Sequence, residues 1–549
     1  MMKKVIKKLL AALLAVAMLC AMAIPAFAYN PGETEEDLDK KHGYIAFQIF
    51  KGVISKDNEG LSGVDWGKHI IDHDDFLEGL RKADRIGPLF ANAKSVPDVL
   101  AVISTWDDSD DDSIAFARFV CHYLYSDGGA PESDIVGQGG AITIREPGYY
   151  LIVDNIYFNN GDSYNAYNSF LLVNVPQAGP QGYNVPIHHK VVKPTVKKKV
   201  FDNFDNQDGS STGDFGSSAD HAINEKFQFQ LIAKLPASKD NGRAYDYYDK
   251  YTVCFNDTLS GGITFDNLDK VEIANVDGDD PKEIADTYYE LDKAGLREAG
   301  QQSSFKLSIA DVKKCADAAR LNLNDGATIT VTYTAHLNEK ASVNTAGGPA
   351  TTDNNNSVYL QYSNNPINTS VGQTPGSKVC VYTYQLNNTK LAESEYGVPL
   401  KGAGFRLYSD KACAEEQEVK LYKKDNFYYP IKDATDKAQD AVEMFSDEHG
   451  QFNVKGLDAG TYYLKETKTP DDYSACADKK IVISATHTEY NVALSGESNL
   501  NNKIINKKAG GITLPSTGGI GTTIFYVVGG GLMVAAIVLL VTKKRMENK

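Results

Sequence analysis

Short runs of alternating apolar and polar residues fill most of the chain, and turns rich in Gly, Asn and Asp separate them. The apolar runs GYYLIVD at 148–154 and SFLLVNV at 169–175 are also strand-like. A period of two is typical of a β-strand with one buried face. Many short strands divided by turn signals predict β-sandwich domains, so the expected fold class is mainly β.

One segment has a different period. Between Ser113 and Tyr125 the apolar side chains recur at near-helical spacing, which predicts a helix within the first part of the chain. The residues concerned are Ile114, Phe116, Ala117, Val120, Cys121 and Leu124. We therefore expect some helix in an otherwise β-rich N-terminal domain.

The strand pattern divides into three tracts, which we interpret as domains. They are expected at 29–189, 190–376 and 377–508, between a leader at 1–28 and a final segment at 509–549. The Pro- and Gly-rich stretch at 177–194 predicts an extended linker between the first two domains.

The first 28 residues combine four lysines, an apolar run and small residues at Ala26 and Ala28. This order predicts a cleavable secretory signal, with the mature chain beginning near Tyr29. The alternative, a membrane anchor, is disfavoured because the apolar run is short and ends in a well-formed cleavage site.

The last segment contains LPSTG at 514–518, an apolar stretch from about Ile524 to Val541, and a basic tail. The stretch is long enough to span a bilayer, and the tail favours the cytoplasmic side. This order of motif, apolar stretch and basic tail resembles the LPxTG sorting signal. The resemblance implies that a sortase cysteine cleaves between Thr517 and Gly518 and passes Thr517, as an acyl group, to an amine. The expected location is the cell wall, with the chain attached to peptidoglycan.

Charge and cysteine content narrow the function classes. The formal charge is −16, and removal of the basic leader and tail leaves about −23, which disfavours nucleic acid as a partner. Six cysteines remain in the exported part, without zinc-ligand spacing or a paired framework. Cys413 with Cys476, and Cys254 with Cys315, are candidate disulfides.

Three groups of segments together resemble the backbone (major) pilins that sortases assemble in Gram-positive bacteria. YIAFQIFKG and EPGYYLIVD resemble the N-terminal pilin domain, and KPTVKKKV, CFNDTLSGGITF and NNNSVYLQYSNNP the middle Cna-type domain. VYTYQLNNTK, VPLKGAGFRLY, LDAGTYYLKET and IINKK resemble a C-terminal Cna-B-type domain. The resemblance implies tandem Ig-like sandwiches, each locked by a spontaneous Lys–Asn isopeptide bond with a neighbouring acid as proton shuttle.

Such a bond requires an apolar pocket. Burial deprotonates the lysine and keeps the carboxyl protonated, so that the amine becomes a nucleophile and the acid can polarise the amide. Ammonia leaves, and no cofactor is needed.

In the C-terminal domain, the resemblance assigns Lys390 as the lysine and Glu466 as the acid. Alternation places Lys390 on the face of Tyr382, Tyr384 and Leu386. The amide is expected from Asn506, with Asn502 as the alternative.

In the middle domain, alternation of Pro194, Val196, Lys198 and Val200 singles out Lys198 among three consecutive lysines. Asp257 matches the acid. Asn356 is the expected amide and Asn364 the alternative. No comparable set occurs in the first domain, where we predict no bond.

Polymerisation requires a lysine that attacks the acyl group on Thr517 of another copy. The family motif of alternating apolar residues ending in Tyr-Pro-Lys aligns with YNVPIHHK, which assigns Lys190, although His188 and His189 replace Tyr and Pro. Lys193 and Lys197 are alternatives.

The sequence does not indicate a metal site or an enzyme active site. His188 and His189 have no third ligand at suitable spacing, and the acidic runs at 107–112 and 277–281 do not fit an EF-hand loop, so no metal site is predicted. Catalytic-triad and phosphate-loop motifs are absent from the sequence, so an enzyme is not expected.

We therefore expect a pilus backbone subunit that supports adhesion, with sortase, further copies of itself, peptidoglycan, minor pilins and a host ligand as partners. A monomeric wall-anchored adhesin or minor pilin is the alternative, and a wall-attached hydrolase is less favoured.

Overall fold

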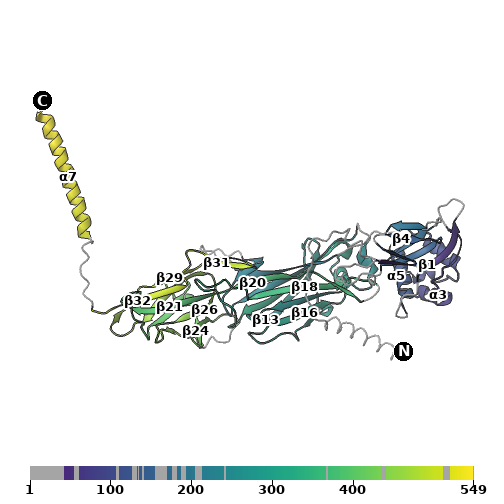
Figure 1. Ribbon diagram of the computed structural model, residues 1–549, viewed down its shortest axis with the longest axis horizontal. Helices are drawn as coiled ribbons and strands as arrows, with labels where there is room; N and C mark the ends of the chain where they lie inside the picture. Colours follow the sequence, from purple (N-terminus) through teal and green to yellow (C-terminus); the bar gives the residue numbers. More distant parts are fainter. Residues whose placement is uncertain are drawn as a thin grey trace.

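The computed structural model describes residues 43–54, 61–106, 110–126, 133, 135–138, 141–154, 170–175, 182–186, 193–203, 213–239, 243–366, 369–434, 440–510 and 520–547. Within these residues three β-rich domains lie end to end along one axis, with a separate helix beyond the last domain (Figure 1). The predicted mainly-β fold class is confirmed. The predicted leader, the LPSTG motif and Lys190 lie outside the described residues.

The N-terminal domain combines one sheet with a set of helices. The sheet has the order β2-β1-β5-β6, with β3 on β1, and a separate pair consists of β4 and β7. The strands are β1 (Gly43–Ile54), β2 (Leu61–Trp66), β3 (Val136–Gln138), β4 (Ala141–Ile144), β5 (Gly148–Asp154), β6 (Phe170–Val175) and β7 (Tyr183–Pro186). The helices are α3 (His73–Arg81), η1 (Gly87–Phe90), α4 (Val96–Ile103) and α5 (Asp111–Leu124). Helix α5 confirms the helix predicted around Ser113.

The two faces of strand β5 pack into two different hydrophobic cores. Leu151 and Val153 pack with the helices, whereas Tyr150 and Ile152 pack toward the β4–β7 pair. Successive side chains of a strand point to opposite faces, so the continuous apolar run of β5 is buried on both faces. The pairing of β7 with β4 shows that the stretch expected to be a linker contains a strand of this domain.

The middle domain is a sandwich of two sheets. One has the order β14-β13-β17-β11-β8-β9; the other is β10-β20-β18-β12-β16-β15, with β19 on β18. The first sheet contains β8 (Thr195–Asp202), β9 (Asp214–Gly216), β11 (Lys226–Leu235), β13 (Ile263–Asn275), β14 (Lys282–Glu283) and β17 (Ala327–Leu337). The second contains β10 (Ser218–Asp220), β12 (Val253–Leu259), β15 (Tyr289–Asp292), β16 (Ser303–Ile309), β18 (Asn355–Ser363), β19 (Val371–Gln373) and β20 (Ser377–Tyr382). Helix α6 (Val312–Ala318) and the short helices η3 (Ala244–Tyr247), η4 (Asp286–Tyr288) and η5 (Leu323–Asp325) connect strands.

The C-terminal domain is a second sandwich, built on the sheets β23-β24-β26-β21-β32-β28 and β25-β22-β27-β29, with a β30–β31 hairpin. Its first strands are β21 (Tyr384–Ala392), β22 (Gly404–Tyr408), β23 (Leu421–Lys424), β24 (Phe427–Pro430), β25 (Met444–Phe445) and β26 (Asn453–Leu457), with η6 (Glu415–Gln417) between them. The remaining strands are β27 (Gly460–Lys468), β28 (Tyr473–Ser474), β29 (Lys479–Ile483), β30 (Ala485–Thr488), β31 (Asn491–Leu494) and β32 (Asn501–Lys508). Strands β21 and β32 pair in parallel.

The boundary between these two domains differs from the sequence-based division at residue 377. Strand β20 pairs with β18 and β10, so it belongs to the middle-domain sheet. The chain then passes through Thr383 directly into β21 of the next domain. The continuous alternation from Tyr382 to Lys390 therefore covers two strands in two domains, which is why sequence pattern alone did not show the break.

A single apolar helix, α7 (Ile520–Glu547), follows the C-terminal domain. Among the described residues, its segment Val527–Lys544 is the one long and apolar enough to cross a membrane, with a mean hydropathy of 1.8. This agrees with the predicted apolar stretch from Ile524 to Val541.

Candidate isopeptide sites

Strand β8 places a lysine inside the middle-domain sandwich. Successive side chains on a strand point to opposite faces, and Lys198 is the one of three consecutive lysines that faces inward, with 1% of its surface exposed. Lys197 lies on the exposed face. The predicted choice of Lys198 among the three therefore agrees with the strand's orientation.

Two partners expected from the sequence surround this lysine from the opposite sheet. The Nζ atom of Lys198 contacts Oδ2 of Asp257 on β12. Asn356 on β18 is fully buried in the same core, and Leu259 of β12 is its cross-strand partner. The sandwich thus brings a lysine, an acid and an amide together from strands far apart in sequence.

Burial shifts both charged groups of this site toward their neutral forms. Burial lowers the pKa of Lys198 to about 8, although Asp257 acts in the opposite direction. Burial also raises the pKa of Asp257, against the effects of Lys198 and Tyr333. The aromatic rings of Phe229 and Tyr333 lie 5.2 Å from Nζ and complete the apolar lining.

A fourth residue, Tyr333 on β17, connects the other three, and the sequence reasoning missed it. Lys198 Nζ donates to its hydroxyl over 3.1 Å, and the hydroxyl donates to Asp257 Oδ1 over 3.2 Å. The amide nitrogen of Asn356 also contacts this hydroxyl, whereas Oδ1 of Asn356 is buried without a hydrogen-bond partner. Tyr333 lies in the fully buried run of β17, but no spacing rule links that strand to Lys198 before the fold is known.

The C-terminal domain contains a second set, with direct contact between lysine and amide. Nζ of Lys390 on β21 contacts Oδ1 of Asn506 on the neighbouring strand β32. Glu466 on β27 accepts a hydrogen bond from Asn506 Nδ2 over 2.8 Å, and its Oε1 lies 3.5 Å from Lys390 Nζ. The side chains of Lys390 and Glu466 are both fully buried.

The surroundings of Lys390 favour the neutral amine. Burial lowers its pKa, against the effects of Cys476 and Glu466. The Phe405 ring lies 5.5 Å from Nζ, and the backbone N–H of Cys476 donates to Glu466 Oε2 over 2.8 Å. This second hydrogen bond fixes the carboxyl beside the lysine and the amide.

The alternative amides lie elsewhere. Asn364 is buried but accepts a hydrogen bond from Ser370, and Asn502 donates to the backbone carbonyl of Asn499. The geometry therefore places Asn356 and Asn506, rather than these two, in the clusters.

The candidate disulfides are not formed. All six cysteines of the exported part are free thiols. The thiol of Cys413 lies 3.9 Å from Asp478 Oδ2, whereas Cys476 lies in the Lys390 site, so the two are engaged in different surroundings. The structure therefore contains neither of the two candidate pairs, Cys413–Cys476 and Cys254–Cys315.

Comparisons with family models give two matches, both in the C-terminal part of the chain. Residues 385–498 match the family model of the SpaA prealbumin-like fold domain, and residues 506–548 match the LPXTG cell wall anchor motif. The chain is therefore a cell-wall-anchored surface protein built from tandem β-sandwich domains. Its C-terminal sandwich is a prealbumin-like domain of the SpaA type.

Several solved structures are similar over long stretches. The T6 backbone pilin of Streptococcus pyogenes is 14% identical, with a TM-score of 0.43, covering 87% of this chain and 97% of that one. The pilus 2b backbone protein of group B streptococcus is 22% identical, with a TM-score of 0.37, covering 58% and 99%. The major pilin SpaD of Corynebacterium diphtheriae is 16% identical, with a TM-score of 0.37, covering 68% and 81%. A comparison with curated proteins gives no match.

Proposed function

We propose that this chain is the backbone subunit of a covalently polymerised pilus whose middle and C-terminal domains are each locked by a Lys–Asn isopeptide bond. The observation that carries the proposal is the burial of Lys198 and Lys390 beside a carboxyl and an amide. Burying a lysine is costly and rare, and here it happens twice with the same chemistry.

The reaction balances within each domain. The neutral lysine Nζ attacks Cγ of the asparagine, a new amide C–N bond forms, and the original carboxamide C–N bond breaks. The departing nitrogen takes up the proton that the amine loses and leaves as ammonia. Each site reacts once, so the chain is a structural protein and not an enzyme.

The acids relay this proton. Glu466 lies within reach of both Lys390 and Asn506, so it can accept a proton from the amine and pass it to the leaving nitrogen. In the middle domain, Asp257 contacts Lys198, and Tyr333 connects Asp257 to Asn356. Rotation of the Asn356 amide by half a turn exchanges its two terminal atoms. When a protonated Asp257 donates to the Tyr333 hydroxyl, the hydroxyl hydrogen is free to bond to the amide carbonyl and polarise it for attack.

The bonds join strands that would otherwise separate under tension. The Lys198–Asn356 bond links β8 in one sheet of the middle domain to β18 in the other. The Lys390–Asn506 bond links β21 to its parallel neighbour β32, the last strand before the membrane segment. Because the three domains lie in line (Figure 1), tension along the chain crosses covalent links in two of them.

Polymerisation uses the ends of the exported chain. A sortase forms an acyl group at Thr517 by cleaving the bond to Gly518, and Lys190 of another copy supplies the amine. At the base of the fibre, an amine of peptidoglycan takes its place. Minor pilins and a host ligand are further expected partners, and adhesion is the expected role.

Denaturing electrophoresis of cell-wall extracts tests the polymer. We expect a ladder of high-mass species, and we expect Lys190→Ala to abolish it while Lys193→Ala and Lys197→Ala leave it intact. A ladder that persists in Lys190→Ala contradicts the assignment of that lysine. Complete absence of a ladder in the wild type supports the monomeric adhesin instead.

A further inference from the structure

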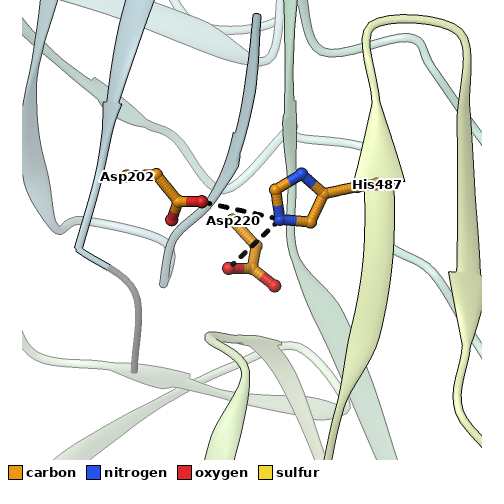
Figure 2. A group of neighbouring side chains, drawn as sticks. All are labelled: Asp202, Asp220 and His487. Carbon is orange, nitrogen blue, oxygen red and sulfur yellow. Dashed lines mark ion pairs between the residues drawn. The ribbon is translucent and has the colours of Figure 1, made fainter. Parts of the chain in front are cut away.

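Acidic and histidine side chains from two domains meet where the middle and C-terminal domains join. Asp202 ends β8 and Asp220 ends β10, both in the middle domain, and His487 lies on β30 of the C-terminal domain. Figure 2 shows the imidazole of His487 pointing between the two carboxylates. Its Nε2 atom lies 3.7 Å from Asp202 Oδ2 and 3.8 Å from Asp220 Oδ1.

These separations suit a shared ion better than a direct hydrogen bond. A hydrogen bond between nitrogen and oxygen spans about 2.7–3.2 Å, so both distances are too long for one. Two ligand atoms that each lie about 2.1 Å from a common ion are separated by roughly 3–4 Å. The three candidate ligand atoms lie within 4.8 Å of one another.

Neighbouring groups hold the ligands in the orientation that metal binding needs. The Nδ1 atom of His487 lies 2.9 Å from Ser218 Oγ, and the Tyr384 hydroxyl donates to Asp220 Oδ2 over 2.8 Å. Metal-binding histidines commonly use the second ring nitrogen in this way, and ligand carboxylates are commonly hydrogen-bonded.

A second histidine lies at the same junction, in a separate group of candidate ligands. His221 follows Asp220 in the chain, has 2% of its surface exposed, and its Nε2 lies 2.7 Å from the carbonyl of Phe201. Because a carbonyl only accepts hydrogen bonds, Nε2 carries a hydrogen, and Nδ1 is the second ring nitrogen. That Nδ1 has no hydrogen-bond partner and lies 3.9 Å from Glu225 Oε1, in a group that also includes Asp458.

A buried carboxylate needs a compensating charge, and Nζ of Lys432 lies 3.8 Å from Glu225 Oε2 in this second group. The junction thus gathers carboxylates of both domains around two imidazole nitrogens. Mixed nitrogen and carboxylate ligands favour zinc and similar transition metals over calcium, which prefers oxygen alone.

We propose that Asp202, Asp220 and His487 bind a divalent transition-metal ion of the zinc class between the middle and C-terminal domains. The ion joins β8 and β10 to β30, so it fixes the angle between two domains that the isopeptide bonds lock only internally. This site does not depend on polymerisation.

Metal retention by the purified exported chain, residues 29–517, tests the proposal. After loading with zinc chloride and exhaustive dialysis, we expect one zinc ion per chain by elemental mass spectrometry. His487→Ala should weaken zinc binding at least tenfold in calorimetric titration. The matched control is His449→Ala, since His449 is exposed in the same domain and should leave binding unchanged.

Asp202→Asn serves as a second variant, because it keeps the shape of the side chain if His487→Ala disturbs the fold. It should also weaken zinc binding, and calcium chloride should not compete with zinc. A wild-type chain that retains no zinc overturns the proposal. Equal affinity of the wild type, His487→Ala and Asp202→Asn overturns it as well.

Discussion

The hydroxyl of Tyr333 lies 3.1 Å from Nζ of Lys198. It also bonds to the acid and contacts the amide, so the middle-domain site is a network of four side chains. In the C-terminal domain the lysine contacts its amide directly, without an intervening hydroxyl. The two sites therefore differ in how the amide is activated, and each can be tested by itself.

Intact mass of the exported chain measures both bonds at once. We expect the wild type to weigh less than its sequence by two molecules of ammonia, because each bond releases one. Lys198→Ala and Lys390→Ala should each restore one ammonia, and fragmentation should identify the pairs 198–356 and 390–506. An unshifted wild-type mass contradicts the proposed chemistry.

Tyr333→Phe tests the role of the phenol in the middle domain. The ring should stay in place against Phe229, whose centroid lies 5.3 Å away, while the hydroxyl is lost. In enzymes, removal of one hydrogen-bond donor to a reacting carbonyl slows the reaction by about a hundredfold or more. We expect formation of the Lys198–Asn356 bond to slow by about a hundredfold in this variant. A time course of intact mass after synthesis should show prompt loss of one ammonia and slow loss of the second.

Tyr362→Phe is the matched control, because Tyr362 is buried on the same strand as Asn356. It should form both bonds at the wild-type rate. If Tyr333→Phe also completes both bonds at that rate, Tyr333 contributes packing only.

The sequence predicted much of this arrangement and missed specific parts of it. Strand alternation placed Lys198 and Lys390 on the same faces as neighbouring apolar residues, since the period of two fixes the face of every residue in a strand. The resemblance to the pilin family, and not the spacing, indicated that these lysines are buried. Tyr333 was missed because its partners come from three other strands, and such proximity depends on how the sheets stack. His487 was missed as a ligand for the same reason, since Asp202 and Asp220 come from another domain.

Glu466→Gln tests how far the C-terminal bond stabilises its domain. The substitution keeps the shape of the side chain but removes the proton relay. The Lys390–Asn506 bond should therefore not form, and the chain should keep the mass of one ammonia. Lys390 and Asn506 are 116 positions apart, and a cross-link over a loop of this length stabilises by about 5 kcal/mol, mainly through the unfolded state. Calorimetry should show a lower unfolding temperature for this domain.

The control for that experiment is Glu448→Gln, an exposed residue of the same domain that pairs with Lys401 at the surface. It should keep the bond and the wild-type unfolding temperature. Equal unfolding temperatures of a bonded wild type and an unbonded Glu466→Gln chain would show that the bond does not stabilise the fold.

The stability of an unbonded middle domain should depend on alkaline pH. In Asn356→Ala the bond cannot form, and Lys198 keeps a folded-state pKa of about 8, below the pKa of 10.5 of an exposed lysine. Between these two values the unfolded chain binds more protons than the folded chain, so the free energy of unfolding rises with pH. Denaturant titrations at pH 8 and pH 10 should show this rise in Asn356→Ala. The double variant Lys198→Met, Asn356→Ala should not show this rise in the free energy of unfolding. An equal change with pH in the two variants would contradict burial of a titrating lysine.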